Sequence, residues 1–344
     1  MGSDGIRYRP HKHGIGKQRP MKKTVVLSII IVHYRTRELT LQCLRSIREF
    51  TPRVPYEILL IDNGSHDGIG EALTEEFPKV RLIETGRNDG FSQANNLGIV
   101  NAHGKYLLLL NSDTKILEPV FDRLVQYMDA HSEVGCIGPQ HVGGDGRHQV
   151  SYGKFPDLFS EVLRKIVDYQ IALNDPNIRG YLTDFCSTEQ EVDWLSGSCI
   201  LLRREALRQA GLLDETFFMY FEDIDLCKRL RDHGWKVIYC PMSKILHYSG
   251  QSVKENILAG LVAYRQSQLY FARKHFGRRG DYLVRIILFL KFGAIAVRAL
   301  SEFVTQKLLG RDAHPAYIKM LLSKKVFEMI FQHNRMRPVE PVLS

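Results

Sequence analysis

The sequence predicts an α/β fold with a mostly parallel, Rossmann-like sheet and flanking helices. Short apolar runs, typical of strands buried on both faces, alternate along the chain with segments of helical periodicity. Several of these runs end in polar or acidic residues, as expected where parallel strands form a ligand-binding edge. With 344 residues, 44% of them hydrophobic, the chain is long enough for a large core and an additional segment.

The expected elements follow one another as a strand–helix repeat. Strands at 25–32, 56–61, 80–84 and 106–110 are separated by helices at 38–50, 70–77 and 91–103. Such a repeat predicts right-handed crossovers and parallel pairing. Further on we expect helices at 119–131, 158–173, 204–210 and 226–233, strands at 134–138, within 191–203 and at 235–239, and a long loop at 141–157.

The net charge of +9 is unevenly distributed, because both ends are strongly basic and the middle is slightly acidic. We therefore expect a flexible basic arm at 1–23, a catalytic domain at 24–253 and a basic amphipathic helical region at 254–344. The acidic middle argues against a nucleic-acid groove and favours contact of the ends with an anionic membrane surface. The alternative is that the charged ends are simply solvated.

The cysteines and the first twenty residues indicate the cellular compartment of the protein. No two of the six cysteines form a CxxC pair, so neither a zinc site nor a disulfide framework is predicted. The first twenty residues are polar and basic and contain no apolar segment, unlike a secretory signal. We expect a cytoplasmic protein, peripheral at the inner face of the membrane.

Polar side chains follow three of the predicted parallel strands, at the edge of the sheet where a nucleotide would bind. Asp113 comes after the apolar run 106–110, where a carboxylate is well placed to hold a divalent cation against a phosphate. The alternative for Asp113 is a cap of the next turn. His33, Tyr34, Asp62 and Asn63 follow the first two strands, although Asp62-Asn63-Gly64 is also good turn chemistry by itself.

Two nucleotide-binding motifs are absent from the sequence. No G-x-G-x-x-G follows the first strand, and G-x-x-x-x-G-K-[ST] does not occur. Their absence argues against a dinucleotide oxidoreductase and a phosphate-loop ATPase.

An acidic cluster follows an aromatic run in the second half of the chain. Glu222, Asp223 and Asp225 come directly after residues 217–221, four of which are aromatic. A carboxylate desolvated by aromatic rings acquires a raised pKa and suits general-base catalysis. The alternative is that the charges only meet the dipole of a helix start.

Three more features have two interpretations each. His247 is either structural or a metal ligand with Asp113. Trp194, followed by Ser196-Gly197-Ser198, either borders a sugar or belongs to the core. Residues 283–300 are apolar but place Arg285, Lys291 and Arg298 on roughly one helix face, which indicates an interfacial helix or one packed on the domain or in an oligomer.

The chain resembles family-2 inverting glycosyltransferases of the GT-A fold, and most closely the bacterial rhamnosyltransferase branch. The resemblance covers about residues 25–250 and depends on five motifs in a fixed order. These are D-N-G-S at 62–65, G-F-S-Q-A-N-N-L-G at 90–98, L-L-L-N-S-D-T at 108–114, W-L-S-G-S-C at 194–199 and F-M-Y-F-E-D-I-D-L at 218–226.

The resemblance implies a role for each matching residue. Asp223 would be the catalytic base with Glu222 beside it, and Asp113 and His247 would hold Mg²⁺ or Mn²⁺. Asn111 stands where many members have Asp, which lowers the charge of the metal site. The nucleotide would be bound by His33, Tyr34, Asp62, Asn63, Asn88 and Asn111. The donor sugar and the acceptor would be bordered by Trp194, Ser196, Gly197 and Ser198.

The implied reaction is transfer of a sugar from a dTDP- or UDP-sugar, with dTDP-L-rhamnose the expected donor. The expected acceptor is a lipid-linked or polysaccharide hydroxyl in cell-envelope glycan synthesis. The alternatives are a UDP-sugar-dependent enzyme of the same fold, a sugar nucleotidyltransferase and a non-catalytic carbohydrate-binding relative. A homo-oligomer is compatible with all of them.

Overall fold

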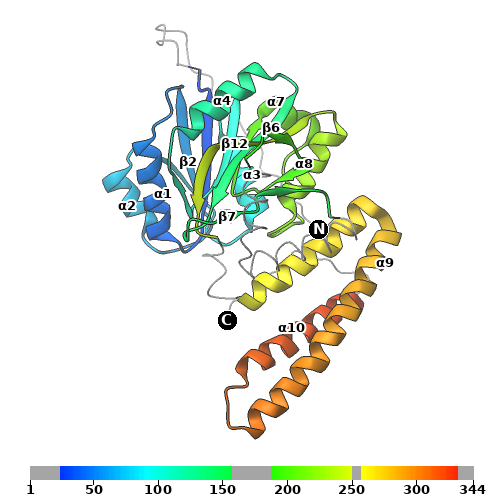
Figure 1. Ribbon diagram of the computed structural model, residues 1–344. Coiled ribbons are helices and arrows are strands. Elements are labelled where there is room, and N and C mark those ends of the chain that lie inside the picture. The colour runs from blue at the N-terminus through cyan, green and yellow to red at the C-terminus, as the bar shows by residue number, and fades with distance from the viewer. Residues whose placement is uncertain (1–23, 157–186, 250–256, 332–344) are drawn as a thin grey trace, which may run out of the picture.

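The computed structural model describes residues 24–156, 187–249 and 257–331. Within these ranges a ten-stranded sheet has the order β3-β2-β1-β4-β11-β6-β12-β5, with β7 and β9 added at β6 and β12. Helices cover the sheet, and a long helical hairpin extends away from it (Figure 1). The predicted arm at 1–23 and the predicted helix at 158–173 lie outside the described residues.

The first half of the sheet is parallel, as predicted. β1 (Leu27–His33) lies between β2 (Tyr56–Asp62) and β4 (Tyr106–Asn111), and β3 (Arg81–Glu84) pairs with β2. The register sets His33 opposite Asp62 and Val32 opposite Asn111, so these strands end at one edge. The connecting helices are α1 (Arg37–Glu49), α2 (Ile69–Glu76) and α3 (Phe91–Asn101).

The second half of the sheet is mixed. β11 (Cys199–Arg203) is antiparallel to both β4 and β6 (Val134–Val142), and β12 (Lys236–His247) is parallel to β6 and antiparallel to β5 (Thr114–Ile116). The last strand is longer than predicted. Its pairing skips from Cys240 to Lys244, so Pro241 sits in an irregularity where its missing N–H does no harm.

Three other boundaries differ from the prediction. The expected loop at 141–157 contains β7 (His148–Gln149) and β8 (Tyr152–Gly153). The expected strand within 191–203 is three short strands, β9 (Gln190–Glu191), β10 (Trp194–Leu195) and β11, and β10 pairs with β8. Helix α8 (Glu222–Asp232) begins at the acidic cluster itself, whereas α4 (Val120–Ala130) and α7 (Arg204–Ala210) lie where expected.

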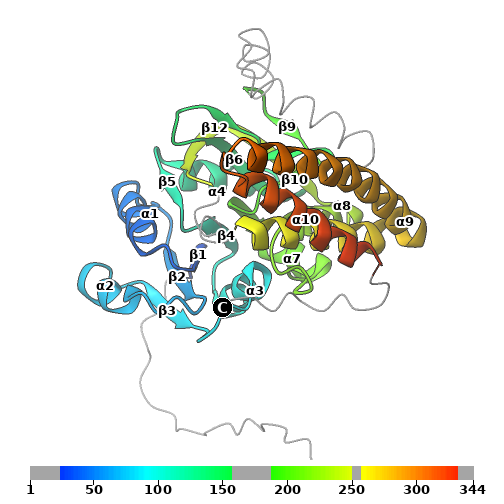
Figure 2. The same cartoon turned by 90° about the horizontal axis from the view of Figure 1, so that it is seen from below.

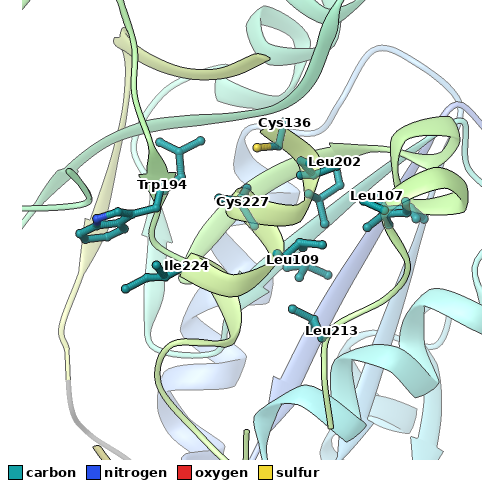
Figure 3. Packing of buried hydrophobic residues seen from close by; sticks show 14 of the residues in the cluster. Leu107, Leu109, Cys136, Trp194, Leu202, Leu213, Ile224 and Cys227 are labelled. Carbon is teal, nitrogen blue, oxygen red and sulfur yellow. The ribbon is translucent and has the colours of Figure 1, made fainter. Parts of the chain in front are cut away.

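The core has two layers, one on each face of the sheet. Leu107 and Leu109 of β4 belong to one layer, and Tyr106, Leu108 and Leu110 to the other. This alternation confirms that the central apolar run is a strand buried on both faces. Figure 3 shows the first layer, in which Leu107, Leu109, Cys136, Trp194, Leu202, Leu213, Ile224 and Cys227 pack together.

The C-terminal region is helical, as expected. Helix α9 (Ile257–Leu308) changes direction at Gly277, whose φ is 64°, and α10 (His314–Phe331) folds back along its second part (Figure 2). Arg285 does not lie on an exposed face with Lys291 and Arg298, contrary to the expectation. It is buried, pairs with Asp281 at 2.8 Å and donates to two carbonyl oxygens at the end of α10, which lack helical partners.

None of the helices in the described ranges combines the length and apolarity that crossing a bilayer requires.

Two helical glycines give a paired test of the packing between α3 and β1. A Cβ at Gly98 would lie 2.3 Å from Ile30 Cγ2, whereas one at Gly70 in α2 would meet Leu82 at an ordinary 3.4 Å. We expect Gly98→Ala to lower the free energy of unfolding, because overpacking costs about 1–3 kcal/mol. Gly70→Ala should be neutral or stabilising by up to about 1 kcal/mol. Urea unfolding of both variants checks this, and equal midpoints would contradict it.

Candidate active site at the carboxyl edge of the sheet

The backbone at the carboxyl edge of the parallel strands is unusual. In the described ranges, the non-glycine residues with positive φ are Arg35, His66, Tyr220, Phe221 and Ser249. They follow β1, β2 and β12 or directly precede α8. Such conformations are costly and cluster at functional sites.

Asp113 and His247 meet at this edge. His247 Nε2 lies 3.3 Å from Asp113 Oδ1, and both side chains are largely buried. The antiparallel pairing of β5 with β12 sets Thr114 opposite His247 and so brings the two residues together. Gln149 fixes the imidazole, because its amide contacts both His247 Nδ1 (3.2 Å) and the His247 carbonyl (2.9 Å).

This pair suits a cation that arrives with a diphosphate. The described residues contain no group of three or more His, Cys, Asp or Glu that could cage a metal. Mg²⁺ is usually bound by one or two carboxylates together with substrate phosphates and water, which one carboxylate and one imidazole allow. Asn111 Oδ1, two residues before Asp113, is buried with no hydrogen-bond partner in the described ranges, so it is a spare acceptor.

Asp223 is held at the start of α8 by backbone donors. Its Oδ2 accepts the Gly197 N–H at 2.8 Å, and its Oδ1 accepts the Ile224 N–H at 2.8 Å. Burial raises the pKa of Asp223, and these hydrogen bonds partly oppose the rise. A Cβ at Gly197 would lie 3.4 Å from both Asp223 Cβ and Phe91 Cε1, so this glycine lies directly beside both residues.

The two other carboxylates of the cluster have different environments. Glu222 is buried, and its Oε2 has no hydrogen-bond partner among the described residues. Burial and the nearby Asp223 raise the pKa of Glu222 well above its ordinary value. Asp225 is fully buried but accepts from Arg229, Lys274 and His275 at 2.7–2.8 Å, which lower its pKa despite the burial. Asp225 therefore anchors α8 to α9.

A chain of contacts connects the Asp113 side of the site with the Asp223 side. The His141 ring meets the His247 ring edge-on at 5.7 Å, and His141 Nδ1 lies 3.2 Å from Ser198 Oγ. Ser198 Oγ lies 2.8 Å from Ser196 Oγ, and Gly197 between these serines donates to Asp223. The two acidic positions are thus connected through one continuous set of contacts.

The sequence prediction missed His141. The sequence predicts a loop at 141–157, whereas His141 lies near the carboxyl end of β6 and is buried at the edge that holds Asp113 and His247. Burial and the neighbouring His247 and His148 hold its pKa well below the usual range. A polar residue that follows a predicted strand, as His141 follows the strand at 134–138, is the sequence feature that indicates a position at this edge.

Two of the predicted binding residues, His33 and Trp194, are buried and hydrogen-bonded within the protein. His33 is fully buried, with Nδ1 2.8 Å from Thr40 Oγ1 and Nε2 3.1 Å from the Asp67 carboxylate. Trp194 belongs to the core and donates its indole N–H to the Lys154 carbonyl at 2.9 Å. The core interpretation of Trp194 therefore fits the structure better than an open sugar platform.

The residues after β2 form an interlocked turn. Asp62 Oδ1 accepts the Ser65 N–H at 3.0 Å, and Asn63 donates to Asn88 Oδ1 at 2.9 Å. The Arg35 guanidinium stacks on Tyr34, 5.3 Å from the ring centroid. The turn chemistry predicted for Asp62-Asn63-Gly64 is thus present, and it fixes the shape of this end of the edge.

Comparison with known proteins agrees with this geometry. The family model described as glycosyl transferase family 2 matches residues 28–211, more than half of the chain. An N-acetylglucosaminyl-diphospho-decaprenol L-rhamnosyltransferase of Mycobacterium tuberculosis is 31% identical over 267 residues, which cover 74% of this chain and 86% of the relative.

Solved structures show the same fold. A mannosyltransferase from Pyrobaculum calidifontis in complex with GDP-Man and Mn²⁺ superposes with a TM-score of 0.54 and 16% identity, over 90% of this chain and 88% of the other. GalNAc-T7 with UDP, GalNAc and Mn²⁺ gives a TM-score of 0.51 and 16% identity, over 75% of this chain and 52% of the other. The protein therefore belongs to glycosyl transferase family 2 and has the GT-A fold.

Proposed function

We propose that the protein is an inverting glycosyltransferase that moves L-rhamnose from dTDP-L-rhamnose to a lipid-linked or polysaccharide acceptor in cell-envelope glycan synthesis. The observation that carries the mechanism is the contact chain joining Asp113 and His247 to Asp223 at one edge. The choice of sugar and lipid-linked acceptor is supported by the name of the relative from Mycobacterium tuberculosis.

Asp223 acts as the general base in this proposal. As an acceptor hydroxyl oxygen attacks the anomeric carbon, its proton passes to the Asp223 carboxylate and the bond to the diphosphate breaks. A single displacement inverts the anomeric configuration. The raised pKa of Asp223 improves its strength as a base, and the Gly197 N–H keeps its other oxygen in place. Burial and the neighbouring Asp223 raise the pKa of Glu222 well above its ordinary value, which disfavours a second negative charge beside the base.

The donor lies along the strand ends. Asp113 and His247 would hold Mg²⁺ or Mn²⁺, and a bound cation would neutralise charge on the leaving diphosphate. Asn111 offers its unpartnered oxygen there. The nucleotide is bordered by Tyr34, Asp62, Asn63 and Asn88. His33 contributes indirectly, because it fixes the Asp67 carboxylate. The sugar is bordered by Ser196, Gly197 and Ser198, and Trp194 supports these residues from the core.

A donor screen tests the proposed reaction. We expect nucleotide release from dTDP-L-rhamnose, but not from UDP-sugars, when a polyprenyl-diphosphate-linked sugar is supplied as acceptor. Asp223→Asn should lower kcat by about 10²–10⁴, the usual contribution of general-base catalysis, without weakening dTDP binding. Asp232→Asn is the matched control, because Asp232 is an exposed carboxylate on the same helix that pairs only with Lys228 in the described contacts.

Three results would contradict this assignment. Release from UDP-sugars alone would indicate the UDP-sugar-dependent alternative. Pyrophosphate release from a sugar phosphate and dTTP would indicate a nucleotidyltransferase. Full transfer activity of Asp223→Asn would remove the proposed base.

Metal binding gives an independent test of the Asp113–His247 pair. His247→Gln should weaken Mn²⁺ binding in the presence of dTDP by about tenfold or more, because even outer-shell partners contribute that much. Isothermal titration measures this change, with the exposed His103→Gln as control. Equal Mn²⁺ affinities of the two variants would show that His247 is not a ligand.

We also propose that the hairpin formed by α9 after Gly277 and by α10 contacts an anionic membrane surface, at the inner face of the cell membrane. Its outer face is apolar, and Leu290, Val297 and Leu308 are 65%, 73% and 82% exposed. An open groove of about 560 Å³ between the two helices continues this face and is lined mainly by apolar side chains. Lys324 is among the residues that line the groove, and Lys307 and Lys325 are also exposed on the hairpin, so charge and apolarity both suit anionic lipid.

The hairpin also lies on the side of the molecule where β1, β2 and β4 end (Figures 1 and 2). A lipid-linked acceptor held at the membrane would therefore lie on the same side of the molecule as the strand ends.

Vesicle binding tests the membrane proposal. The double variant Leu290→Glu/Val297→Glu should lose sedimentation with vesicles of phosphatidylcholine and phosphatidylglycerol, because it places charge in the apolar face. Thr305→Glu, on an exposed polar position of the same helix, should bind nearly as well as the parent protein. Absence of vesicle binding by the parent protein, together with a concentration-dependent dimer that the double variant abolishes, would instead show an interface between two copies.

A further inference from the structure

Two strained aromatic residues lie directly before the acidic cluster. Tyr220 and Phe221 both have φ of 70°, in the left-handed region that bulky side chains rarely adopt. Phe221 is also the N-cap of α8, so its conformation sets the direction of the first turn of that helix. Strain of this kind persists only where the surrounding structure over-determines it.

The first part of α9 supplies most of that restraint. Ser267 Oγ donates to the Met219 carbonyl at 2.8 Å. The Tyr264 ring meets the rings of Tyr220 and Phe221 edge-on, at centroid distances of 5.5 Å and 5.2 Å. One helix thus holds three consecutive residues of the segment that leads into α8.

The opposite end of the aromatic segment is held by α3. The Phe91 N–H donates to the Phe218 carbonyl at 2.7 Å. Gly90 lies so close to Phe218 that an added Cβ would be 2.7 Å from its ring and from its carbonyl oxygen. The segment is therefore fixed between α3 and α9 and cannot relax toward either side without losing contacts.

The same part of α9 also fixes α8 two residues beyond Asp223. Lys274 and His275 both reach the buried Asp225 carboxylate at 2.7 Å. Lys274 contacts Asp214 in addition, which ties α9 to the segment before the aromatic run. Asp223 therefore lies between two attachments of α8 to α9.

We infer that Tyr264 and Ser267 of α9 are positioning residues for Asp223. By holding Met219 and the left-handed residues Tyr220 and Phe221, they aim the first turn of α8 so that the Asp223 carboxylate accepts the Gly197 N–H. This inference rests on the proposed function, which makes Asp223 the base. The C-terminal region up to Gly277 is then part of the active-site framework, and the hairpin beyond Gly277 is a separate element.

Steady-state kinetics of the full-length protein test this role. Tyr264→Ala should lower kcat of transfer about a hundredfold, the cost of a misplacement of about 1 Å, while dTDP affinity stays unchanged. Tyr264→Phe keeps the ring and should restore kcat. Ser267→Ala removes only one hydrogen bond and should lower kcat in the same direction, so the test survives if Tyr264→Ala fails to fold. Leu261→Ala, at a partly exposed position of the same helix, is the control.

The outcomes separate the inference from the proposed function. If Asp223→Asn is inactive but both Tyr264→Ala and Ser267→Ala keep full kcat, the positioning role is wrong and the base assignment stands. If the α9 variants lose dTDP affinity in the same proportion as kcat, they act through general destabilisation and the inference is also wrong. If Asp223→Asn is fully active, the inference falls together with the proposed base.

Discussion

The hydrogen bond from the Gly197 N–H to the Asp223 carboxylate is the contact on which the rest of the site depends. It joins the sheet, through the turn before β11, to the first turn of α8. The turn is fixed in its place because the Asn111 N–H donates to the Ser198 carbonyl at 2.9 Å, next to the end of β4. The proposed cation-binding position and the proposed base are therefore connected through one backbone segment.

Solvation and partners give the carboxylates of the site different properties. Asp225 pairs with Arg229, Lys274 and His275, which lower its pKa despite its burial, so it serves as an anchor. Asp223 has only backbone donors and a raised pKa, and Glu222 has a spare buried oxygen and a pKa raised further. Asp113 has an imidazole and faces the strand ends. Sequence proximity alone would not have separated these roles, since three of the four residues lie within one helical turn.

Local patterns in the sequence predicted the parallel half of the fold and the residues at its edge. The run at 106–110 is apolar without interruption, and it is buried on both faces as that pattern requires. Predictions were less accurate where tertiary contacts override local signals. The strand predicted at 235–239 continues as β12 to His247, because its pairing with β6 resumes at Lys244 after an irregularity. The sequence predicts Arg285 on one helix face with Lys291 and Arg298. In the structure Arg285 is buried, because it donates to carbonyl oxygens at the end of α10, 44 residues away. The left-handed turn at Tyr220 and Phe221 carries no sequence signal, because aromatic residues do not favour it.

A crystal structure of the protein with dTDP and Mn²⁺ tests this arrangement most directly. We expect anomalous density for Mn²⁺ bound by Asp113 and His247 and by the diphosphate, with the Asp223 carboxylate still accepting the Gly197 N–H and facing the space beside the diphosphate. Mn²⁺ density away from Asp113 and His247, or an Asp223 side chain separated from the bound diphosphate by the body of the protein, would contradict it.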